Sequence, residues 1–386
     1  MHSRLCLRET LFTREYSSGK RICNEGVFFQ MITIEALVLK EYIQKIFQAA
    51  GSPVDEAEII SDHLVGANLR GHDSHGIIRT LGYVTGLLEK RFAAGAGFEI
   101  IKETPSTAVT DGGMNLGQVA AHHGMHLAIK KATTSGIGLV TVRGTGHIGR
   151  LGHYGEIACR AGMIGMAGVN VPGGQIVASY GGGHRRVATN PIMFALPTDR
   201  IDAPFVLDMA TSVLAEGKMK VAVNKGVTVP EGVLIDGDGK ATVDPNDLYG
   251  TGENEKRGAL LPFGGLLSGY KGFGLSLAME ALGGILSGSG SAKESVRGTN
   301  GTWLMAINIA NFLDPEDWKY EVAELLNFVK EPPYAENFTE VLTAGEPERI
   351  RMAERLSSGI PVDEETWKQI SEAATSVGVS PIQSFD

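Results

Sequence analysis

The chain has 386 residues and a formal net charge of −9, from 35 Lys and Arg against 44 Asp and Glu, so neither nucleic acid nor an acidic membrane surface is favoured as a partner. Its three cysteines, Cys6, Cys23 and Cys159, make neither a disulfide framework nor a metal-binding cluster, which fits a reducing cytoplasm. No apolar run reaches the roughly 18 to 20 residues needed to span a bilayer.

In chain order, the sequence divides into four segments. Residues 1–30 mix acidic and basic side chains without an apolar period, and we interpret them as a disordered leader or as sequence ahead of a true start at Met31. Residues 31–104 have helical spacing over 32–50, 53–69 and 76–88. Short apolar strands alternate with helices over 105–291, which predicts an α/β domain. Residues 292–386 hold a strand at 303–309 and then further helices.

The stretch 70–83 concentrates groups that could transfer protons and bind anions. Gly71 is suited to end one helix, and Ser74 could cap the next. If that second helix covers 76–88, His75 and Arg79 stand four residues apart on one face. An imidazole beside a guanidinium suggests a proton donor next to a carboxylate clamp. The ordinary alternative is a capping serine and a solvated arginine.

A glycine-rich turn at 144–149 matches the dinucleotide fingerprint G-x-G-x-x-G between a strand and a helix. The fingerprint also needs an acidic residue at the end of the second strand, where the sequence has Val-Asn-Val-Pro at 169–172. We therefore favour the alternative that the glycines expose His147 at the end of a strand, where it could act as an acid or base.

Other polar residues allow two interpretations each. His122, His123 and His126 could hold a metal on one helix, but without a carboxylate cluster solvated histidines suffice, and no metal site is expected. Asp208 follows an apolar strand and could bind a ribose hydroxyl or cap a helix. Lys271 opens a predicted helix, where it could bind phosphate or remain solvated.

Two further features lie between these motifs. The residues 236–239, Asp-Gly-Asp-Gly, predict a hairpin turn and lack the ligand positions of a calcium loop. Arg185 and Arg186 could meet the 2′-phosphate of NADP, but they do not decide between NAD and NADP.

Together the motifs resemble one family. They occur in the order found in the malate/L-lactate dehydrogenase family, which the chain resembles from about residue 31 to 360, and they lie at 70–79, 146–149, 189–191, 208–212, 261–262, 271–274 and 344–348. Two departures are visible: an acidic residue that some members have near 171–172 is missing, and Ala344 replaces a proline. The first departure affects the expected substrate more than the expected activity.

The resemblance implies a nicotinamide-dependent oxidoreductase with an α/β fold that is not a Rossmann fold. A central mixed-sheet domain, 105–291, would bind NAD or NADP, and a helical domain would be built from both chain ends, 31–104 and 292–386. A homodimer would hold a small 2-hydroxy or 2-oxo acid between subunits. The alternatives are a cyclic imino acid reductase on the same scaffold and a non-catalytic dinucleotide-binding protein.

The family's functional positions are carried over by motif. His75 or His147 would be the proton donor and acceptor, and Ser74 and Arg79 would bind the substrate carboxylate. The expected cofactor contacts are Asn170, Thr189, Asn190, Asp208, Met209, Ala210, Lys271, Gly345, Glu346 and Pro347.

Overall fold

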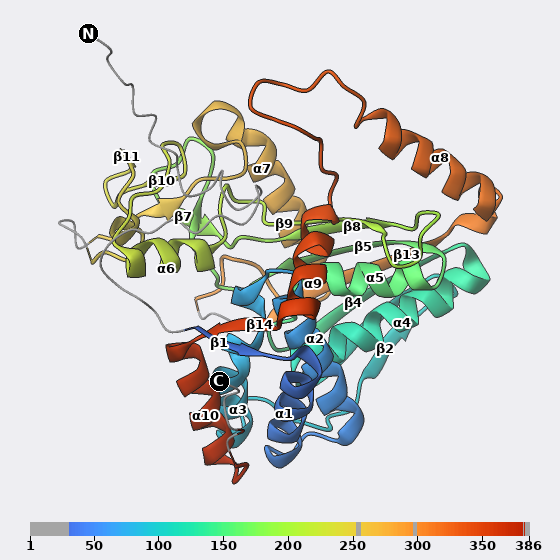
Figure 1. Cartoon of the computed structure of the whole chain (residues 1–386), viewed down its shortest axis with the longest axis horizontal. Coiled ribbons are helices and arrows are strands. Elements are labelled where there is room, and N and C mark those ends of the chain that lie inside the picture. The colour runs from blue at the N-terminus through green and yellow to red at the C-terminus, as the bar shows by residue number, and fades with distance from the viewer. Residues whose placement is uncertain (1–30, 252–255, 296–298, 381, 383–386) are drawn as a thin grey trace.

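The computed structural model describes residues 31–251, 256–295, 299–380 and 382. The leader predicted for residues 1–30 lies outside these ranges. The described chain folds into a helical part, a larger sheet covered by helices, and a smaller sheet beside them (Figure 1). None of its described helices combines the length and the apolar character needed to cross a membrane.

The helical part is built from both ends of the chain, as predicted. Its elements are β1 (Met31–Ile34), α1 (Ala36–Ala49), α2 (Val54–Leu69), α3 (Thr80–Leu88), α9 (Glu346–Ser358), β14 (Ile360–Asp363) and α10 (Glu364–Ser376). β1 pairs with β14 in antiparallel register, from Met31 opposite Asp363 to Ile34 opposite Ile360. Buried residues from α1, α2 and α3 share one core with Ile370 and Ala373 of α10. The prediction of helix at 32–34 is wrong, because this segment finds a partner strand near the other end of the chain.

The larger sheet has seven strands in the described residues, in the order β2-β3-β4-β13-β5-β8-β9. Its strands are β2 (Glu99–Glu103), β3 (Thr107–Asn115), β4 (Ile137–Thr145), β5 (Met163–Asn170), β8 (Ile192–Leu196), β9 (Phe205–Met209) and β13 (Asn300–Asn308). β3 and β4 are parallel, and every other neighbouring pair is antiparallel. A Rossmann fold would need β4 and β5 as parallel neighbours, but β13 separates them. The predicted mixed, non-Rossmann sheet is confirmed.

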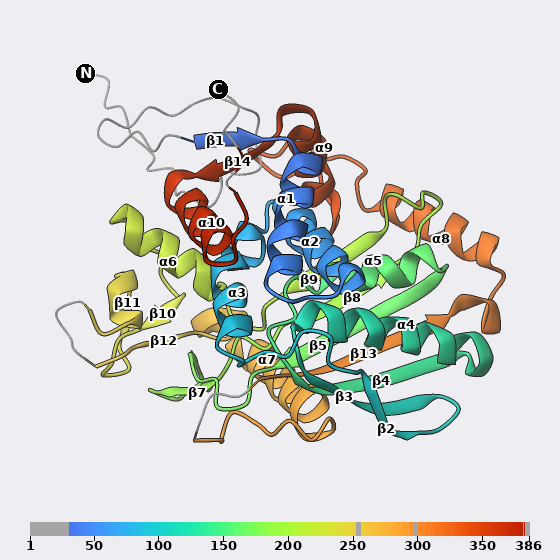
Figure 2. The same ribbon diagram turned by 90° about the horizontal axis from the view of Figure 1, so that it is seen from below.

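Helices cover both faces of this sheet (Figure 2). Leu304 of β13 joins the core formed with α4 (Gly117–Ser135) and α5 (Gly152–Arg160). Trp303, the preceding residue, packs with Met279 at the end of α7 (Gly265–Met279), which continues as η4 (Glu280–Ile285). Successive side chains of a strand point to opposite faces, so α4 and α5 lie on one side and α7 on the other.

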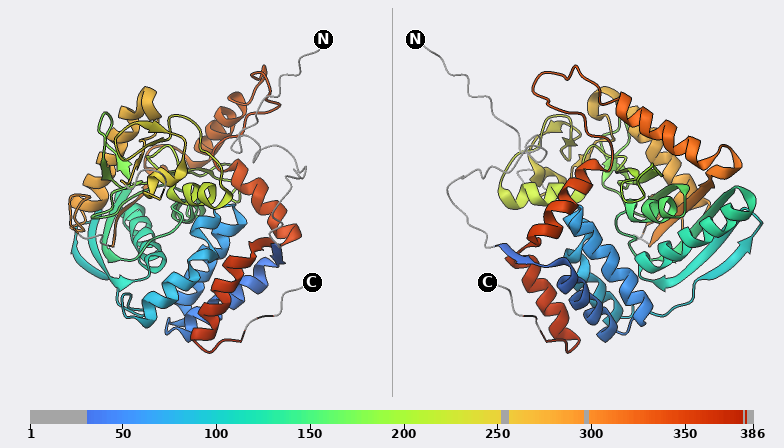
Figure 3. Two further views of the ribbon diagram at one scale, coloured as in Figure 1. Left: turned by 90° about the vertical axis from the view of Figure 1, so that its left-hand side faces the viewer. Right: turned by 45° about the vertical axis from the view of Figure 1, so that its right-hand side comes forward.

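β13 corrects the expected division of the chain. It falls within 292–386, which was expected to complete the helical domain, but it pairs with β4 on one side and β5 on the other. For residues 300–308 that assignment is wrong, because Leu304 and Ala306 are buried in the core of the larger sheet and not in that of the helical part. α8 (Pro315–Phe328) then lies along the sheet and not among the other terminal helices (Figure 3), with Trp318 Nε1 donating to Pro197 O at 3.0 Å.

The smaller sheet has the order β11-β10-β12-β6-β7 among the described residues. Its strands and helical segments are β6 (Val177–Ala178), β7 (Arg185–Val187), α6 (Glu216–Lys225), β10 (Leu234–Ile235), β11 (Ala241–Thr242), η3 (Pro245–Leu248) and β12 (Ala259–Leu260). β10 and β11 are antiparallel, and Asp236 O accepts the Gly239 N–H in the turn between them. The predicted hairpin at 236–239 is therefore confirmed.

Candidate active site

The segment after α2 differs from the single capped helix that the sequence predicts. It forms two 3₁₀ turns, η1 (Asp73–His75) and η2 (Ile77–Arg79), before α3 begins at Thr80. The Asn68 side chain, not that of Ser74, caps the second turn, because its Oδ1 accepts the Ile77 N–H at 2.8 Å. Gly76 makes room for it: a Cβ at Gly76 would lie 1.9 Å from Asn68 Oδ1. The prediction that Ser74 is a helix N-cap is wrong.

This geometry frees Ser74 for its neighbours. Its hydroxyl lies 3.0 Å from Nδ1 of His75, and its carbonyl accepts a hydrogen bond from Nε of Arg79 at 2.7 Å. The structure therefore brings together the serine, histidine and arginine that the sequence singles out. Burial, followed by the positive charge of Arg79, lowers the pKa of His75 to about 3. His75 is consequently neutral at physiological pH.

His147 joins this group from the loop after β4. Its ring stacks on that of His75, with a centroid separation of 5.5 Å and an interplanar angle of 26°. Both rings are half-buried. The two histidines that the sequence places seventy-two residues apart thus form one pair, at the junction of the helical part and the larger sheet.

Sequence reasoning missed two residues behind His147. The Tyr83 hydroxyl lies 2.7 Å from Nδ1 of His147, and Gln118 Nε2 donates to the same hydroxyl at 3.1 Å. Burial raises the pKa of Tyr83 to about 12, so the phenol keeps its proton at neutral pH. One signal was available, because Tyr83 follows His75 and Arg79 at four-residue intervals. Gln118 gave no such signal.

Packing within the protein explains the glycines of the apparent dinucleotide fingerprint. Gly149 has φ +76°, and a Cβ there would lie 2.1 Å from Nε2 of His63, which accepts the Arg150 N–H at 2.9 Å. Gly144 has φ +59°, and its Cβ would lie 2.5 Å from Oδ1 of Asp111. These glycines therefore permit a tight turn against neighbouring side chains and need no pyrophosphate to explain them.

The segments expected to contact a cofactor adjoin one another. Thr211 N–H donates to Thr189 O at 2.9 Å, and Phe263 N–H donates to Thr211 O at 2.8 Å. Gly272 packs on Phe263, since a Cβ at Gly272 would lie 2.4 Å from the Phe263 nitrogen. Lys271, one residue earlier, is exposed. These contacts join the stretches around 189–190, 208–212 and 271–274.

Three of these residues have structural partners. Asp208 Oδ2 accepts the Gly152 N–H at 2.8 Å and so caps α5. Asn170 and Asn190 are fully buried, and their amide groups donate to the carboxylate of Glu280.

Lys271 does not open its helix, because α7 begins at Gly265. A non-helical backbone at Ser268 separates the first turn from the segment that contains Lys271.

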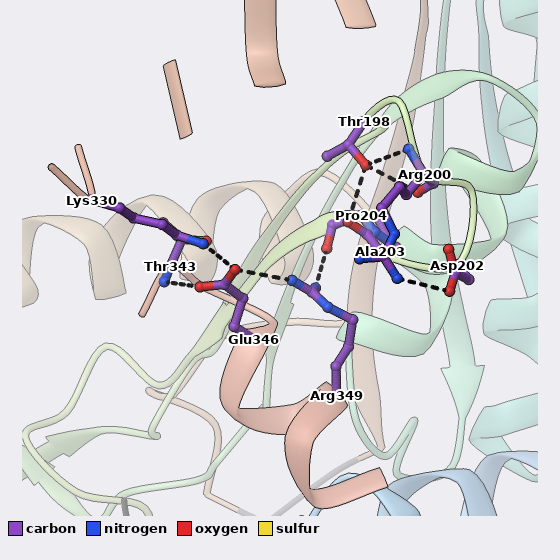
Figure 4. Close-up of polar contacts among 9 residues, drawn as sticks. All are labelled: Thr198, Arg200, Asp202, Ala203, Pro204, Lys330, Thr343, Glu346 and Arg349. Atoms are coloured by element: carbon purple, nitrogen blue, oxygen red, sulfur yellow. Dashed lines mark hydrogen bonds and ion pairs between the residues drawn. The ribbon is translucent and has the colours of Figure 1, made fainter. Parts of the chain in front are cut away.

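The start of α9 and the two residues before it, 344–347, are fixed to the β8–β9 hairpin (Figure 4). Val206 N–H donates to Ala344 O at 3.1 Å, and Arg349 NH1 donates to Pro204 O at 2.8 Å. The Glu346 carboxylate accepts from Lys330 Nζ and, at 2.7 Å, from the Thr343 N–H. Gly345–Pro347 therefore lies next to the strand that ends in Asp208 and Met209.

The donor set suits a dinucleotide. Such a cofactor needs an acceptor for its ribose hydroxyls and positive charge or N–H groups for its pyrophosphate. Asp208 retains a second carboxylate oxygen for a hydroxyl, and the exposed ammonium group of Lys271 can approach a phosphate. Arg185 is less suited to a 2′-phosphate, because its guanidinium donates to the carbonyls of Leu248 and Gly258.

The remaining polar clusters lie outside this group. The rings of His122 and His126 are 4.5 Å apart. In the described ranges, no three His, Cys, Asp or Glu residues are arranged to hold a metal ion. Glu156 bridges two arginines in a buried cluster, 2.8 Å from Arg150 and 2.8 Å from Arg70.

Comparison with known proteins gives one family. The family model for malate/L-lactate dehydrogenase matches residues 34–371. A malate dehydrogenase of Pyrococcus abyssi is 38% identical over 89% of this chain and 95% of its own, and an L-sulfolactate dehydrogenase of Methanocaldococcus jannaschii is 37% identical over 88% and 96%.

The chain also resembles solved structures over most of its length. The malate dehydrogenase of Pyrococcus horikoshii superimposes with a TM-score of 0.82 and 34% identity, over 93% of this chain and 99% of its own. A delta1-piperideine-2-carboxylate reductase of Pseudomonas syringae superimposes with a TM-score of 0.74 and 25% identity, over 89% and 99%.

Proposed function

The chain belongs to the malate/L-lactate dehydrogenase family, and we propose that it is an NAD- or NADP-dependent dehydrogenase that interconverts a small 2-hydroxy acid and its 2-oxo acid. The observation that carries this proposal is the assembly of Ser74, His75, Arg79 and His147 in one site. It combines a carboxylate-binding cation with two imidazoles, which is what an acid/base step on a hydroxy acid requires.

The contacts of each residue indicate its role in the reaction. Arg79, held at the Ser74 carbonyl, binds the substrate carboxylate together with the Ser74 hydroxyl. His147 exchanges the hydroxyl proton, because Tyr83 fixes its ring through Nδ1. His75 stays neutral, since burial and Arg79 hold its pKa at about 3, and it hydrogen-bonds the reacting oxygen. A bound nicotinamide would supply the acceptor or donor for the hydride of the substrate's C2.

Asp208, Met209, Ala210 and Lys271 are the proposed cofactor-binding residues on the sheet side. Gly345, Glu346 and Pro347 would complete that site at the start of α9, which is fixed to β9, and Thr189 and the buried Asn170 and Asn190 would support it through their hydrogen bonds. Calorimetric titration with NAD and NADP, compared with the Lys271→Met variant, tests this arrangement. Unchanged affinity in the variant would remove Lys271 from the site.

A homodimer is also part of the proposal. α7 and η4 expose a series of large apolar side chains, Leu266, Leu267, Tyr270, Leu277 and Ile285. A face of this kind on a monomer marks an interaction surface. Light scattering should give the mass of two chains, and Leu267→Glu should reduce it to one. A monomeric wild-type protein would contradict the dimer. A cytoplasmic location remains a prediction from the cysteine pattern.

The test of the function is a panel of substrates with both cofactors. Malate, lactate and sulfolactate in one direction, and oxaloacetate and pyruvate in the other, should give turnover with NAD(H) or NADP(H). A cyclic imino acid belongs in the panel, because of the likeness to the piperideine-carboxylate reductase. Turnover of that compound alone would favour the reductase, and nucleotide binding without turnover of any compound would favour a non-catalytic protein.

A further inference from the structure

Only one of the two polar atoms in the buried Gln118 amide has a hydrogen-bond partner among the described residues. Gln118 is fully buried in the first turn of α4, and its Nε2 donates to the Tyr83 hydroxyl at 3.1 Å. Its Oε1 is buried and has no hydrogen-bond partner among the described residues. Leaving a buried acceptor without a partner is costly, so such an atom needs an explanation.

The packing of the start of α4 fixes the position of Gln118. A Cβ at Gly117 would lie 2.4 Å from the carbonyl oxygen of His147, so the start of α4 rests directly on the His147 backbone. Gln118 and His147 therefore contact Tyr83 from the sheet side, while Tyr83 itself comes from α3 in the helical part. The ionisable groups facing this trio include His75 and Arg79 from the preceding turns and Tyr154 from α5.

The hydrogen bonds determine which nitrogen of His147 carries the proton. The Tyr83 phenol has one proton, and its pKa of about 12 keeps that proton in place. While Gln118 Nε2 donates to the phenol oxygen, the phenol proton is directed to Nδ1 of His147, and the imidazole carries its own proton on Nε2. That tautomer cannot take a proton from a substrate at Nε2.

Turning the Gln118 amide by half a rotation reverses the direction of the hydrogen bonds that link Gln118, Tyr83 and His147. Gln118 Oε1 then accepts the phenol proton and the phenol oxygen accepts from Nδ1–H of His147, so the imidazole takes up a proton from water at Nδ1 and releases one to water from Nε2. In this tautomer Nε2 of His147 carries a lone pair and can accept a proton from a substrate. The same arrangement suits the imidazolium after it has taken the proton. The partnerless Oε1 is the acceptor that this second arrangement needs.

We infer that Gln118 is a positioning residue that selects the tautomer of His147 through Tyr83, by turning its amide between donor and acceptor. The inference rests on the proposed role of His147 in proton exchange. It assigns Gln118 no contact with substrate or cofactor.

The experiment is a histidine NMR titration combined with a double-mutant cycle. The tautomer and pKa of His147 are read from ring ¹⁵N and ¹³C shifts, assigned by loss of the signal in His147→Gln. Gln118→Met removes the acceptor that the imidazolium needs and should lower the His147 pKa by about one unit, whereas Gln118→Glu supplies a permanent acceptor and should raise it by a similar amount. If Gln118 had only a structural role, the two variants would not shift the His147 pKa in opposite directions.

Tyr83→Phe supplies the decisive comparison. Because Gln118 acts only through Tyr83, Gln118→Met should have no effect on the His147 pKa in the Tyr83→Phe background. The control is Gln175→Met, which removes the amide of an exposed glutamine that donates to Ala292 O at 2.7 Å. An equal shift with and without Tyr83, or no shift from either Gln118 variant, would overturn the inference. If Gln118→Glu does not fold, Gln118→Met and the cycle still decide.

Turnover gives a second readout. In the pH profile of kcat, the limb that reports His147 should move with the NMR pKa in each variant. The NMR titration needs no turnover, so the two proposals fail separately. If no acid in the panel is oxidised, the proposed function fails while the tautomer result stands. If the wild-type protein turns over but the variants leave tautomer and profile unchanged, only the role of Gln118 fails.

Discussion

Glu156 and Arg150 form a buried ion pair, with Oε1 of the carboxylate 2.8 Å from NH2 of the guanidinium. The other carboxylate oxygen lies 2.8 Å from NH2 of Arg70 at the end of α2. The cluster therefore joins the helical part to α5 and the larger sheet. His147 lies just before Arg150 in the chain, so the same junction supports the proposed site.

Removing the carboxylate should destabilise the protein strongly. Glu156→Gln leaves two guanidinium groups without their counter-charge, and breaking a buried pair in this way typically costs about 3–5 kcal/mol. Urea unfolding measures the change. The matched control is Glu316→Gln, which removes an exposed pair with Lys319 and should cost less than about 1 kcal/mol. Equal losses in the two variants would mean that the buried ion pairs of Glu156 stabilise the protein no more than an exposed pair does.

The same cluster predicts how stability depends on pH. Burial by itself would raise the pKa of Glu156, but Arg150 and Arg70 outweigh it and hold the pKa below its ordinary 4.5. A carboxyl group whose pKa is lower in the folded state contributes its full stability above pH 4.5 and loses it as the pH falls through the folded-state value. The difference in unfolding free energy between wild type and Glu156→Gln should therefore be constant near pH 7 and shrink below pH 4.5. A difference that grows on acidification would contradict this sign.

Gly149→Ala distinguishes a packed turn from a dinucleotide-binding turn. The new Cβ would lie 2.1 Å from His63 Nε2 and require φ +76°, so we expect a loss of about 2–5 kcal/mol from crowding and backbone strain together. Gly162→Ala separates the two causes. Gly162 has φ +71° but open space around it, and the substitution should cost only about 1–2 kcal/mol. If Gly149→Ala instead kept full stability and lost only cofactor affinity, the fingerprint would be functional after all.

Local sequence patterns predicted most elements, but not their partners. Apolar spacing gave α2 almost to the residue and gave the strand that became β13, because both depend on neighbours in the chain. The place of β13 between β4 and β5 depends on pairing with strands more than a hundred residues away, which no local period encodes. Within the site, His75, Arg79 and His147 could be predicted from their residue types and their spacing in the sequence.

The parts of the site that were missed share a physical reason. Asn68 displaces Ser74 as a cap only because Gly76 lets its side chain enter, and Gln118 reaches Tyr83 only because α4 packs on the His147 loop. Each depends on a contact between segments distant in sequence. An isolated buried amide has no pattern of its own in a sequence.

Replacing each histidine by alanine should separate their roles. His147→Ala removes the proposed proton-exchanging group and should lower kcat by about 10²- to 10⁴-fold, with cofactor affinity unchanged. His75→Ala removes a neutral hydrogen-bonding partner, so we expect a smaller loss and the same pH profile as wild type. Steady-state kinetics from pH 5 to 10 measure both. The reverse ranking, with the pH-dependent limb lost in His75→Ala, would exchange the two assignments.

Arg79→Met should raise KM far more than it lowers kcat. A guanidinium that binds the substrate carboxylate acts equally on bound substrate and transition state, so its loss weakens binding and leaves the chemical step. A charge-assisted contact contributes about 1.5–3 kcal/mol, which corresponds to a rise in KM of roughly 10- to 150-fold. Arg79→Lys keeps the charge but not the planar fork, and its KM should fall between those of Arg79→Met and wild type. Because Arg79 also lowers the pKa of His75, Arg79→Met should raise that pKa, which histidine NMR can follow without substrate. An unchanged KM together with a raised His75 pKa would place Arg79 beside the site as an electrostatic neighbour and remove it from substrate binding.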